Sequence, residues 1–262
     1  MADKKNIVLS TKDLSIGYRS RTENNIIATD LNLNLYRGEM VSLMGINGIG
    51  KSTLLRTITG VQKELSGKIL IQDKDLKHLP PNEIAKKISV VLTERIPSNN
   101  LTVYELIALG RQPYTNWLGS LSGKDKEQIS FAIEQTGLKD LLNKRCDALS
   151  DGQLQRVMIC RALAQNTEII FLDEPTAHLD IQHKIEIFKI LAELAHKLGK
   201  SILISTHEIQ FGLQMSDKLW LMTRDGILSG TPDEMIQSNN INKIFDTDQI
   251  KFDKDYRQFR II

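Results

Sequence analysis

Eight residues near the start of the chain have the types and spacing of a phosphate-binding loop. Lys51 is expected to reach the β- and γ-phosphates of a nucleotide, and the Ser52 hydroxyl to hold Mg²⁺. Glycines allow a tight turn whose backbone N–H groups converge on phosphate oxygens, and the following helix adds its positive end. A glycine turn ahead of a helix is the plain structural alternative. The segment reads Gly45-Ile46-Asn47-Gly48-Ile49-Gly50-Lys51-Ser52, with Thr53 after it.

Two adjacent carboxylates end an apolar run that reads IIFLDEP. We expect Asp173 to meet the Mg²⁺ held by Ser52. Glu174 is expected to polarise an attacking water as a general base. An acid pair at a strand end is also explained as a solvated helix N-cap, but downstream of a phosphate loop the pair favours nucleotide hydrolysis.

The segment Leu149–Gln153 reads LSDGQ and precedes a helix. Ser150 and Gln153 have the S-x-x-Q spacing of a capping box. A capped helix N-terminus that contains a glycine is also an anion site. We therefore expect Ser150, Asp151, Gly152 and Gln153 to contact a γ-phosphate, and the cap to present them.

His207 follows the strand-like run SILIS and Thr206. Ligands of open α/β sheets bind outside the carboxyl ends of the strands. His207 is therefore expected beside the γ-phosphate and is grouped with Lys51 and Glu174 as catalytic. The other histidines lack such a context and are interpreted as structural: His78, His178, His183 and His196.

A parallel sheet is needed to bring these motifs together. Short apolar runs predict buried strands at residues 39–44, 88–92, 168–172 and 201–205. Alternating leucines at 31–36 predict one half-buried strand. Helices are expected at 51–59 before Gly60, at 125–136 before Gly137, and before Gly199. That last helix carries one apolar face: Ile185, Phe188, Leu191, Leu194 and Leu198. Residues 95–165 have helical signals instead, which predicts a helical insert in an α/β core.

Composition narrows the function classes. The chain has 262 residues and a formal net charge of +2, with acids and bases interspersed, so nothing indicates nucleic-acid binding. Cys146 and Cys160 are too few for a disulfide framework and fit a reducing cytoplasm. No signal peptide is visible, and no run approaches the roughly 18 apolar residues of a spanning helix. A membrane role therefore requires a partner.

The four motifs, in this order, resemble the ATPase subunits of ATP-binding cassette (ABC) transporters. The resemblance extends from about residue 8 to 235. It implies an α/β P-loop NTPase core with a mostly parallel sheet, an N-terminal antiparallel β region and an inserted helical subdomain. The implied division of the single domain is a core at 1–92 and 166–235, a helical subdomain at 93–165 and a C-terminal extension at 236–262.

The resemblance also implies roles for individual residues, with ATP and Mg²⁺ as cofactors. Gly45–Thr53 matches Walker A, Asp173 matches Walker B, Glu174 the catalytic carboxylate and His207 the switch histidine. Leu149–Gln153 matches the signature, which is usually LSGGQ. Tyr18 falls where an aromatic stacks on adenine, and Ala177–Asp180 matches the D-loop. In the family the signature of one subunit completes the site of the other, so an ATP sandwich of two copies is implied.

The chain departs from the family pattern after the strand ISVVL. The family usually has a glutamine there that senses Mg²⁺ and contacts the permease, whereas this chain has Thr93-Glu94. Because a carboxylate binds hard cations better than a hydroxyl, Glu94 is expected to take the metal or coupling role. Ile46 replaces a common proline and is expected to face away from the phosphates.

Residues 101–119 resemble the subgroup that serves importers of iron–siderophores, haem and cobalamin. The most specific part is Ala108-Leu109-Gly110-Arg111, followed by Pro113-Tyr114. This implies a permease dimer, a substrate-binding protein and a peripheral location at the cytoplasmic face of the inner membrane. Tyr104, Tyr114 and Trp117 are expected as permease anchors, although they also suit a subdomain core.

Other functions fit less well. A soluble ABC ATPase of translation usually has two cassettes, and an ABC ATPase of DNA repair needs a long coiled coil for which 51–149 is too short. A small-molecule kinase would lack LSDGQ and His207. An ABC ATPase for another transported substrate and a nucleotide-gated soluble regulator both stay open.

Overall fold

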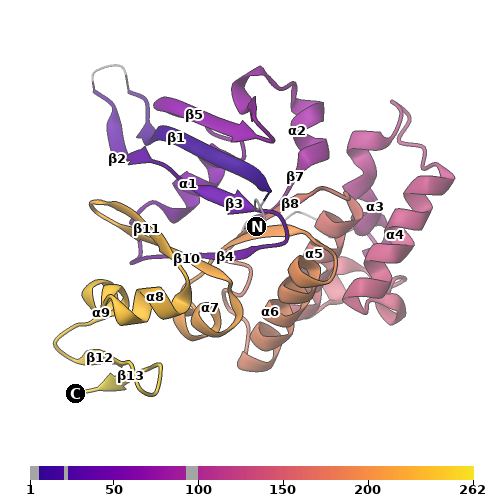
Figure 1. The fold of residues 1–262 in the computed structure, drawn as a ribbon. Helices are drawn as coiled ribbons and strands as arrows, with labels where there is room; N and C mark the ends of the chain where they lie inside the picture. Colours follow the sequence, from indigo (N-terminus) through magenta and orange to yellow (C-terminus); the bar gives the residue numbers. More distant parts are fainter. Residues whose placement is uncertain (1–5, 21–22, 93–99) are drawn as a thin grey trace, which may run out of the picture.

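The computed structural model describes residues 6–20, 23–92 and 100–262. Its centre is a six-stranded sheet with the order β11–β10–β4–β9–β8–β7 (Figure 1). β10, β4, β9, β8 and β7 are parallel, and β11 pairs antiparallel with β10 at the edge. Every residue of β4, β8 and β9 is buried, as parallel strands covered on both faces should be. The strands are β4 (Met40–Met44), β7 (Ile88–Val91), β8 (Ile169–Asp173), β9 (Ser201–Ser205), β10 (Lys218–Thr223) and β11 (Gly226–Gly230).

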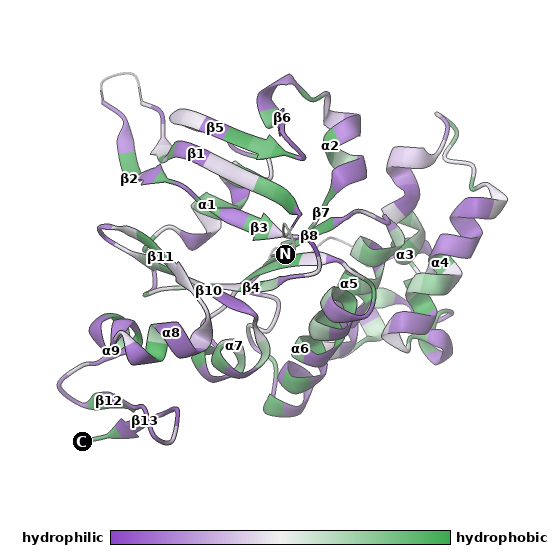
Figure 2. Cartoon of the chain, in the orientation of Figure 1, coloured by the Kyte–Doolittle hydropathy of each residue, from purple (hydrophilic) through white to green (hydrophobic). Residues whose placement is uncertain are grey.

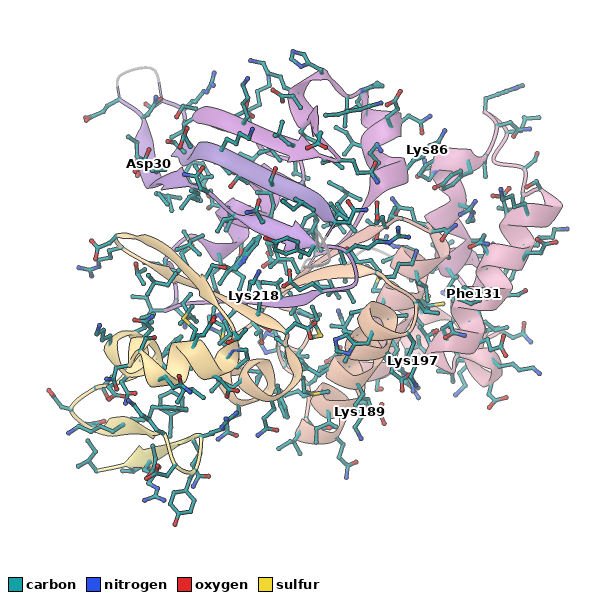
Figure 3. The ribbon with its side chains drawn as sticks, viewed as in Figure 1. Asp30, Lys86, Phe131, Lys189, Lys197 and Lys218 are labelled. Carbon is teal, nitrogen blue, oxygen red and sulfur yellow. The ribbon has the colours of Figure 1, made fainter. Side chains whose placement is uncertain are left out.

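A second, antiparallel sheet covers one face of this centre and confirms the expected N-terminal β region. Its order is β2–β1–β5–β6, with β3 also paired to β1. A shared apolar cluster packs this sheet and helix α1 (Lys51–Ile58) against the central strands. Lys218, labelled in Figure 3, also joins the sheets: its Nζ lies 3.3 Å from Glu39 Oε1 and 4.6 Å from the Tyr36 ring centroid. The strands are β1 (Ile7–Tyr18), β2 (Asn25–Leu31), β3 (Asn34–Tyr36), β5 (Ser66–Ile71) and β6 (Lys74–Asp75).

The single strand expected at residues 31–36 is wrong in one respect. Leu31, Leu33 and Leu35 are all buried as the alternation predicts. However, β2 ends at Leu31 and β3 begins at Asn34. Asn32 causes the break, because its amide accepts from Asp13 N at 3.0 Å and donates to Asp13 Oδ1 at 3.1 Å.

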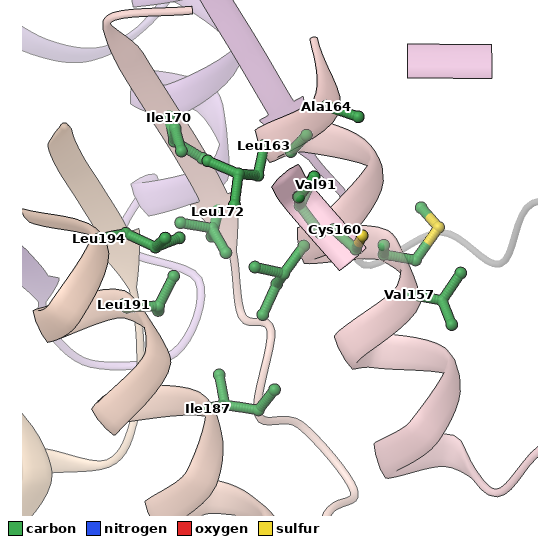
Figure 4. Packing of buried hydrophobic residues seen from close by; sticks show 14 of the residues in the cluster. Val91, Val157, Cys160, Leu163, Ala164, Ile170, Leu172, Ile187, Leu191 and Leu194 are labelled. Carbon is green, nitrogen blue, oxygen red and sulfur yellow. The ribbon is translucent and has the colours of Figure 1, made fainter. Parts of the chain in front are cut away.

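Helices cover the other face of the central sheet. α5 (Asp151–Ala164) and α6 (Ile181–His196) pack on β7 and β8, and Figure 4 shows their apolar side chains meeting. α3 (Val103–Ala108) and α4 (Gly123–Thr136) add to the same cluster, and the 3-10 helix η2 (Leu109–Tyr114) lies against α3, α4 and α5. α4 alternates hydrophilic and hydrophobic colour in Figure 2, as a helix with one buried face should. Smaller helices are α2 (Pro81–Lys87), η1 (Leu76–His78), η3 (Lys139–Leu141) and η4 (Cys146–Ala148).

The C-terminal segment forms a small cluster of its own beside β10. α7 (Ile209–Met215), α8 (Pro232–Gln237) and α9 (Asn240–Phe245) pack there. A two-stranded hairpin, β12 (Ile250–Asp253) with β13 (Gln258–Ile261), follows. Phe252 is buried in this cluster, so the hairpin is anchored to the body of the protein.

The Gly110-Arg111 pair has a structural role in the helical region. A Cβ on Gly110 would lie 2.3 Å from Arg161 O, so only glycine lets η2 approach α5 this closely. Arg111 is buried, donates to Asp125 Oδ1 at 2.9 Å and reaches Ala164 O at 2.8 Å. Hydrogen bonds from Ser122 and the Arg111 guanidinium hold the pKa of Asp125 below its ordinary value, against the effect of burial. Gly110 and Arg111 therefore hold η2, α4 and the end of α5 together.

Replacing Arg111 with methionine should destabilise the fold by about 3–5 kcal/mol, because it leaves the Asp125 carboxylate buried without its partner. Denaturant unfolding of the purified chain would measure this. Adding Asp125→Asn should recover part of the loss. A loss under about 1 kcal/mol would be typical of an exposed pair and would contradict the assignment. Because the pKa of Asp125 is lower in the folded protein than in the unfolded chain, its contribution to the free energy of unfolding is complete at neutral pH. That contribution is lost as the pH falls through the folded pKa.

Candidate nucleotide-binding and hydrolysis site

The phosphate loop connects β4 to α1, the strand–loop–helix context that the motif requires. Gly50 has φ +114°, and a Cβ there would lie 2.3 Å from Ile27 Cγ2, so the loop can turn only with glycine at this position. Lys51 is 5% exposed and its Nζ donates to Gly45 O at 3.0 Å and to Ile46 O at 3.3 Å. Burial lowers the pKa of Lys51, and the nearby charges of Glu174 and Asp173 oppose that effect.

Asp173 lies beside the start of α1, as the sequence predicted. Ser52 Oγ donates to Asp173 Oδ1 at 3.1 Å. Ser205 Oγ donates to the same oxygen at 2.6 Å, because the register of β8 and β9 places the two residues side by side. The hydroxyl of Ser52 and the carboxylate of Asp173 are hard oxygen donors, the kind that Mg²⁺ prefers. This pair therefore fits a magnesium ion that takes its other ligands from phosphates and water.

Glu174 leaves the strand in a conformation that few residues adopt. Its φ is +47°, and its N–H donates to Ser205 O at 3.1 Å and to Ser205 Oγ at 3.0 Å. Its Oε1 lies 2.6 Å from His207 Nε2. The sharp turn separates the two neighbouring carboxylates: Asp173 contacts Ser52, whereas Glu174 contacts His207. Backbone strain of this kind clusters at functional sites.

Ser205 is a site residue that the sequence interpretation left out. It contacts both acids, and only the strand register reveals this. The usable signal was its place at the end of an apolar run, directly before Thr206 and His207. Tyr18 lies near the loop as expected, with its hydroxyl 3.2 Å from Thr53 Oγ1 and its side chain 48% exposed. Glu94, the other expected metal ligand, lies outside the described residues.

The signature residues form a second group, at the start of α5. Ser150 and Gln153 make the expected capping box: Gln153 N donates to Ser150 Oγ, and Ser150 N to Gln153 Oε1, both at 3.2 Å. Asp180 caps α6 in the same way, by accepting from His183 N at 3.0 Å. These bonds stay within the two helix starts and do not bridge to the phosphate loop.

His183 lies between the signature and the D-loop, where its contacts are structural, as the sequence interpretation expected. Its Nδ1 lies 2.7 Å from Asp180 Oδ2. Hydrogen bonds from the backbone and ring of His183 lower the pKa of Asp180. The ring also covers Gly152, since a Cβ on Gly152 would lie 2.3 Å from His183 Cδ2. The cap spacing Asp180-x-x-His183 was the signal in the sequence.

Gly152→Ala should therefore displace the His183 ring and lower ATP turnover, whereas Gly152→Ala in a His183→Ala background should be tolerated better. We expect a coupling free energy of about 0.5–3 kcal/mol between the two changes. Turnover and denaturant unfolding of the four variants in the cycle measure it. Strictly additive effects would mean that the two side chains do not interact.

The geometry is that of a P-loop nucleotide hydrolase with a separate signature helix. The chain belongs to the ABC transporter family, whose model, described as "ABC transporter", matches residues 28–177. It is thus a nucleotide-binding ATPase subunit of that family.

Relatives and solved structures agree with this assignment. The "Probable siderophore transport system ATP-binding protein YusV" of Bacillus subtilis is 36% identical over 238 residues, 90% of this chain and 85% of the relative. An ABC transporter assigned to the metal-chelate type, in an inward-facing conformation, superposes with TM-score 0.79 at 26% identity, covering 92% of this chain and 89% of the other. A dimeric bacterial ABC transporter cassette has TM-score 0.73 at 29% identity, with 86% and 98% covered.

Proposed function

We propose that two copies of this chain hydrolyse ATP between them and drive uptake of a metal chelate, of the iron–siderophore, haem or cobalamin type, through a separate membrane permease. The ATP-hydrolysing part of this proposal is supported by five side chains that lie together at the carboxyl ends of the parallel strands: Lys51, Ser52, Asp173, Glu174 and His207. The siderophore and metal-chelate names of the similar proteins support the transported class.

Within the site, Gly45–Thr53 binds the phosphates, and Lys51 exchanges its bonds to loop carbonyls for bonds to the β- and γ-phosphates. Ser52 and Asp173 hold Mg²⁺, which supplies charge neutralisation at the phosphates. Glu174 is the general base that accepts the proton of the attacking water. His207 orients the Glu174 carboxylate through their 2.6 Å contact and lies next to the γ-phosphate. Tyr18 stacks on the base beside Thr53.

A second copy supplies the remaining contacts. Ser150 and Gln153 of the signature bond to each other and cap the start of α5, so the cap presents this helix end to a ligand. Ser150, Asp151, Gly152 and Gln153 therefore bind the γ-phosphate of ATP held by the partner copy, with Asp180 adjoining them through His183. The positive end of α5 favours that anion.

We assign the work along the chain by segment, with one apolar cluster joining α3, α4 and α5 of the helical subdomain to β8 and α6 of the core. The core at 1–92 and 166–235 performs hydrolysis, the helical subdomain at 93–165 meets the permease, and residues 236–262 form an extension anchored by Phe252. In the described part of the chain, no helix has the length and apolar character needed to cross a membrane. The permease holds the subunit at the cytoplasmic face of the membrane, and a substrate-binding protein delivers the chelate outside.

Single cysteines in the helical subdomain should crosslink to the co-expressed permease. Cys146 and Cys160 are both buried, so introduced thiols at exposed Tyr104 and Leu109 dominate the labelling. Tyr256, 67% exposed in the C-terminal segment, provides the matched control position. Crosslinks from 104 and 109 are expected; crosslinks from the C-terminal position instead would overturn the docking assignment.

Uptake of labelled iron by cells that express the chain with its permease and binding protein tests the transported class. Accumulation of a ferric hydroxamate or catecholate should require ATP hydrolysis and should be lost with Glu174→Gln. Haem and cobalamin serve as the other chelates. Failure of every chelate to accumulate, with ATP turnover intact, would contradict the metal-chelate assignment and leave the ATPase assignment standing.

A further inference from the structure

A tryptophan and a leucine project from the loop between η2 and α4. Trp117 is 91% exposed and Leu118 is 66% exposed. In Figure 1 this loop forms an outer tip of the helical region, far from the antiparallel sheet. The chain's other tryptophan, Trp220, is fully buried in β10. Adjacent large apolar side chains at a tip are unfavourable in water, which suggests a partner surface.

The loop is held in shape by its own hydrogen bonds. Asn116 Oδ1 accepts from Leu118 N at 3.1 Å and from Ser120 N at 3.0 Å. Gly119 N donates to Asn116 O at 2.9 Å, and Thr115 Oγ1 ties the loop to Gln112 O at 3.1 Å. These hydrogen bonds therefore fix the loop in a conformation that leaves the Trp117 indole exposed. A preorganised loop loses little conformational entropy when it binds.

Positive charge accompanies these apolar side chains. Three charged side chains lie between residues 112 and 126: Lys124, Asp125 and Lys126. Both lysines are exposed, whereas Asp125 is buried and ion-paired with Arg111. On α2, Lys86 lies 5.6 Å from the Tyr114 ring centroid and is exposed at the side of α2 next to this region (Figure 3). The tip therefore presents an indole and a leucine with the exposed lysines Lys86, Lys124 and Lys126 near them, and the one exposed acid that follows directly is Glu127.

We propose that the Trp117–Leu118 tip enters the headgroup region of an anionic lipid bilayer next to the permease. Tryptophan concentrates at membrane–water interfaces, and lysines near the surface are attracted by acidic headgroups. Tyr114, in contrast, stacks 3.9 Å from the Arg111 guanidinium and is only 38% exposed. The inference rests on the proposed function, which brings the helical subdomain to the membrane.

Tryptophan fluorescence of the full chain tests this, because Trp220→Phe leaves Trp117 as the only tryptophan. Vesicles containing phosphatidylglycerol should shift the emission to shorter wavelength, and vesicles of phosphatidylcholine alone should do so much less. Replacing Lys124 and Lys126 with alanine should weaken partitioning roughly fivefold per lysine. Alanine at Lys189 of α6 and at Lys197, which directly follows α6, removes the same charge elsewhere and should have little effect; both lysines are exposed and labelled in Figure 3. In a flotation assay Trp117→Ala should lower vesicle binding by at least about tenfold.

Three results would overturn the proposal: no shift with anionic vesicles, an equal shift with both lipids, or a shift on adding detergent-solubilised permease in the absence of lipid. The last would assign the tip to the permease. ATP turnover is measured on the same samples. Because the loop is outside the hydrolytic site, its variants should keep basal turnover, so failure of lipid binding and failure of the ATPase account are distinguishable.

Discussion

Glu174→Gln is expected to lower steady-state ATP turnover by about 10²–10⁴-fold while nucleotide still binds. The amide keeps the size of the side chain and one oxygen for the contact with His207, but it cannot accept a proton from water. The backbone of Glu174 is fixed by two hydrogen bonds to Ser205, so the substitution should leave the local fold unchanged. Phosphate release under saturating Mg-ATP measures the effect.

Glu168→Gln is the matched control for this change. Glu168 directly precedes β8, at the amino ends of the parallel strands and so at the end opposite Glu174. Its Oε1 lies 3.6 Å from Arg37 Nε. Its loss should alter turnover little. Near-normal turnover in Glu174→Gln would remove Glu174 from the role of general base, and an equal loss in Glu168→Gln would indicate a general effect of lost charge.

Lys51→Ala should reduce ATP hydrolysis by at least about 10²-fold and weaken nucleotide binding as well, since it removes a buried cation from the phosphate loop. Burial lowers the pKa of Lys51, and the charges of Glu174 and Asp173 offset only part of that effect, so an anionic ligand beside the side chain would favour its charged form. Arginine keeps the charge but not the reach, and should not rescue activity. Lys63→Ala, an exposed lysine beyond α1, is the control. Turnover within a few fold of the parent in Lys51→Ala would show that this loop is not the hydrolytic site.

Features set by short stretches of chain were predictable from the sequence. The phosphate loop, the capping box of Ser150 and Gln153 and the buried strands depend on residues a few positions apart, and the structure has them where expected. Even Glu174 and His207, which are distant in sequence, were correctly expected at one sheet edge, because both follow parallel strands.

Features that depend on contacts between distant segments were not predictable in the same way. Ser205 meets Asp173 only through the register of β8 and β9, and the break after Leu31 depends on a bond between Asn32 and Asp13. Arg111 belonged to a phrase taken as a subgroup marker. Its role emerges only when η2, α4 and α5 are packed together around the buried pair with Asp125.

The central claim is that ATP binds between two copies, each completing the other's site. Sedimentation velocity of Glu174→Gln with Mg-ATP tests it most directly, because this variant should bind ATP without hydrolysing it. The account predicts a dimer with Mg-ATP and a monomer with ADP. Adding Ser150→Arg, which changes only the signature, should restore the monomer while each copy still binds ATP. A Glu174→Gln chain that binds Mg-ATP and stays monomeric at high concentration would contradict the composite site.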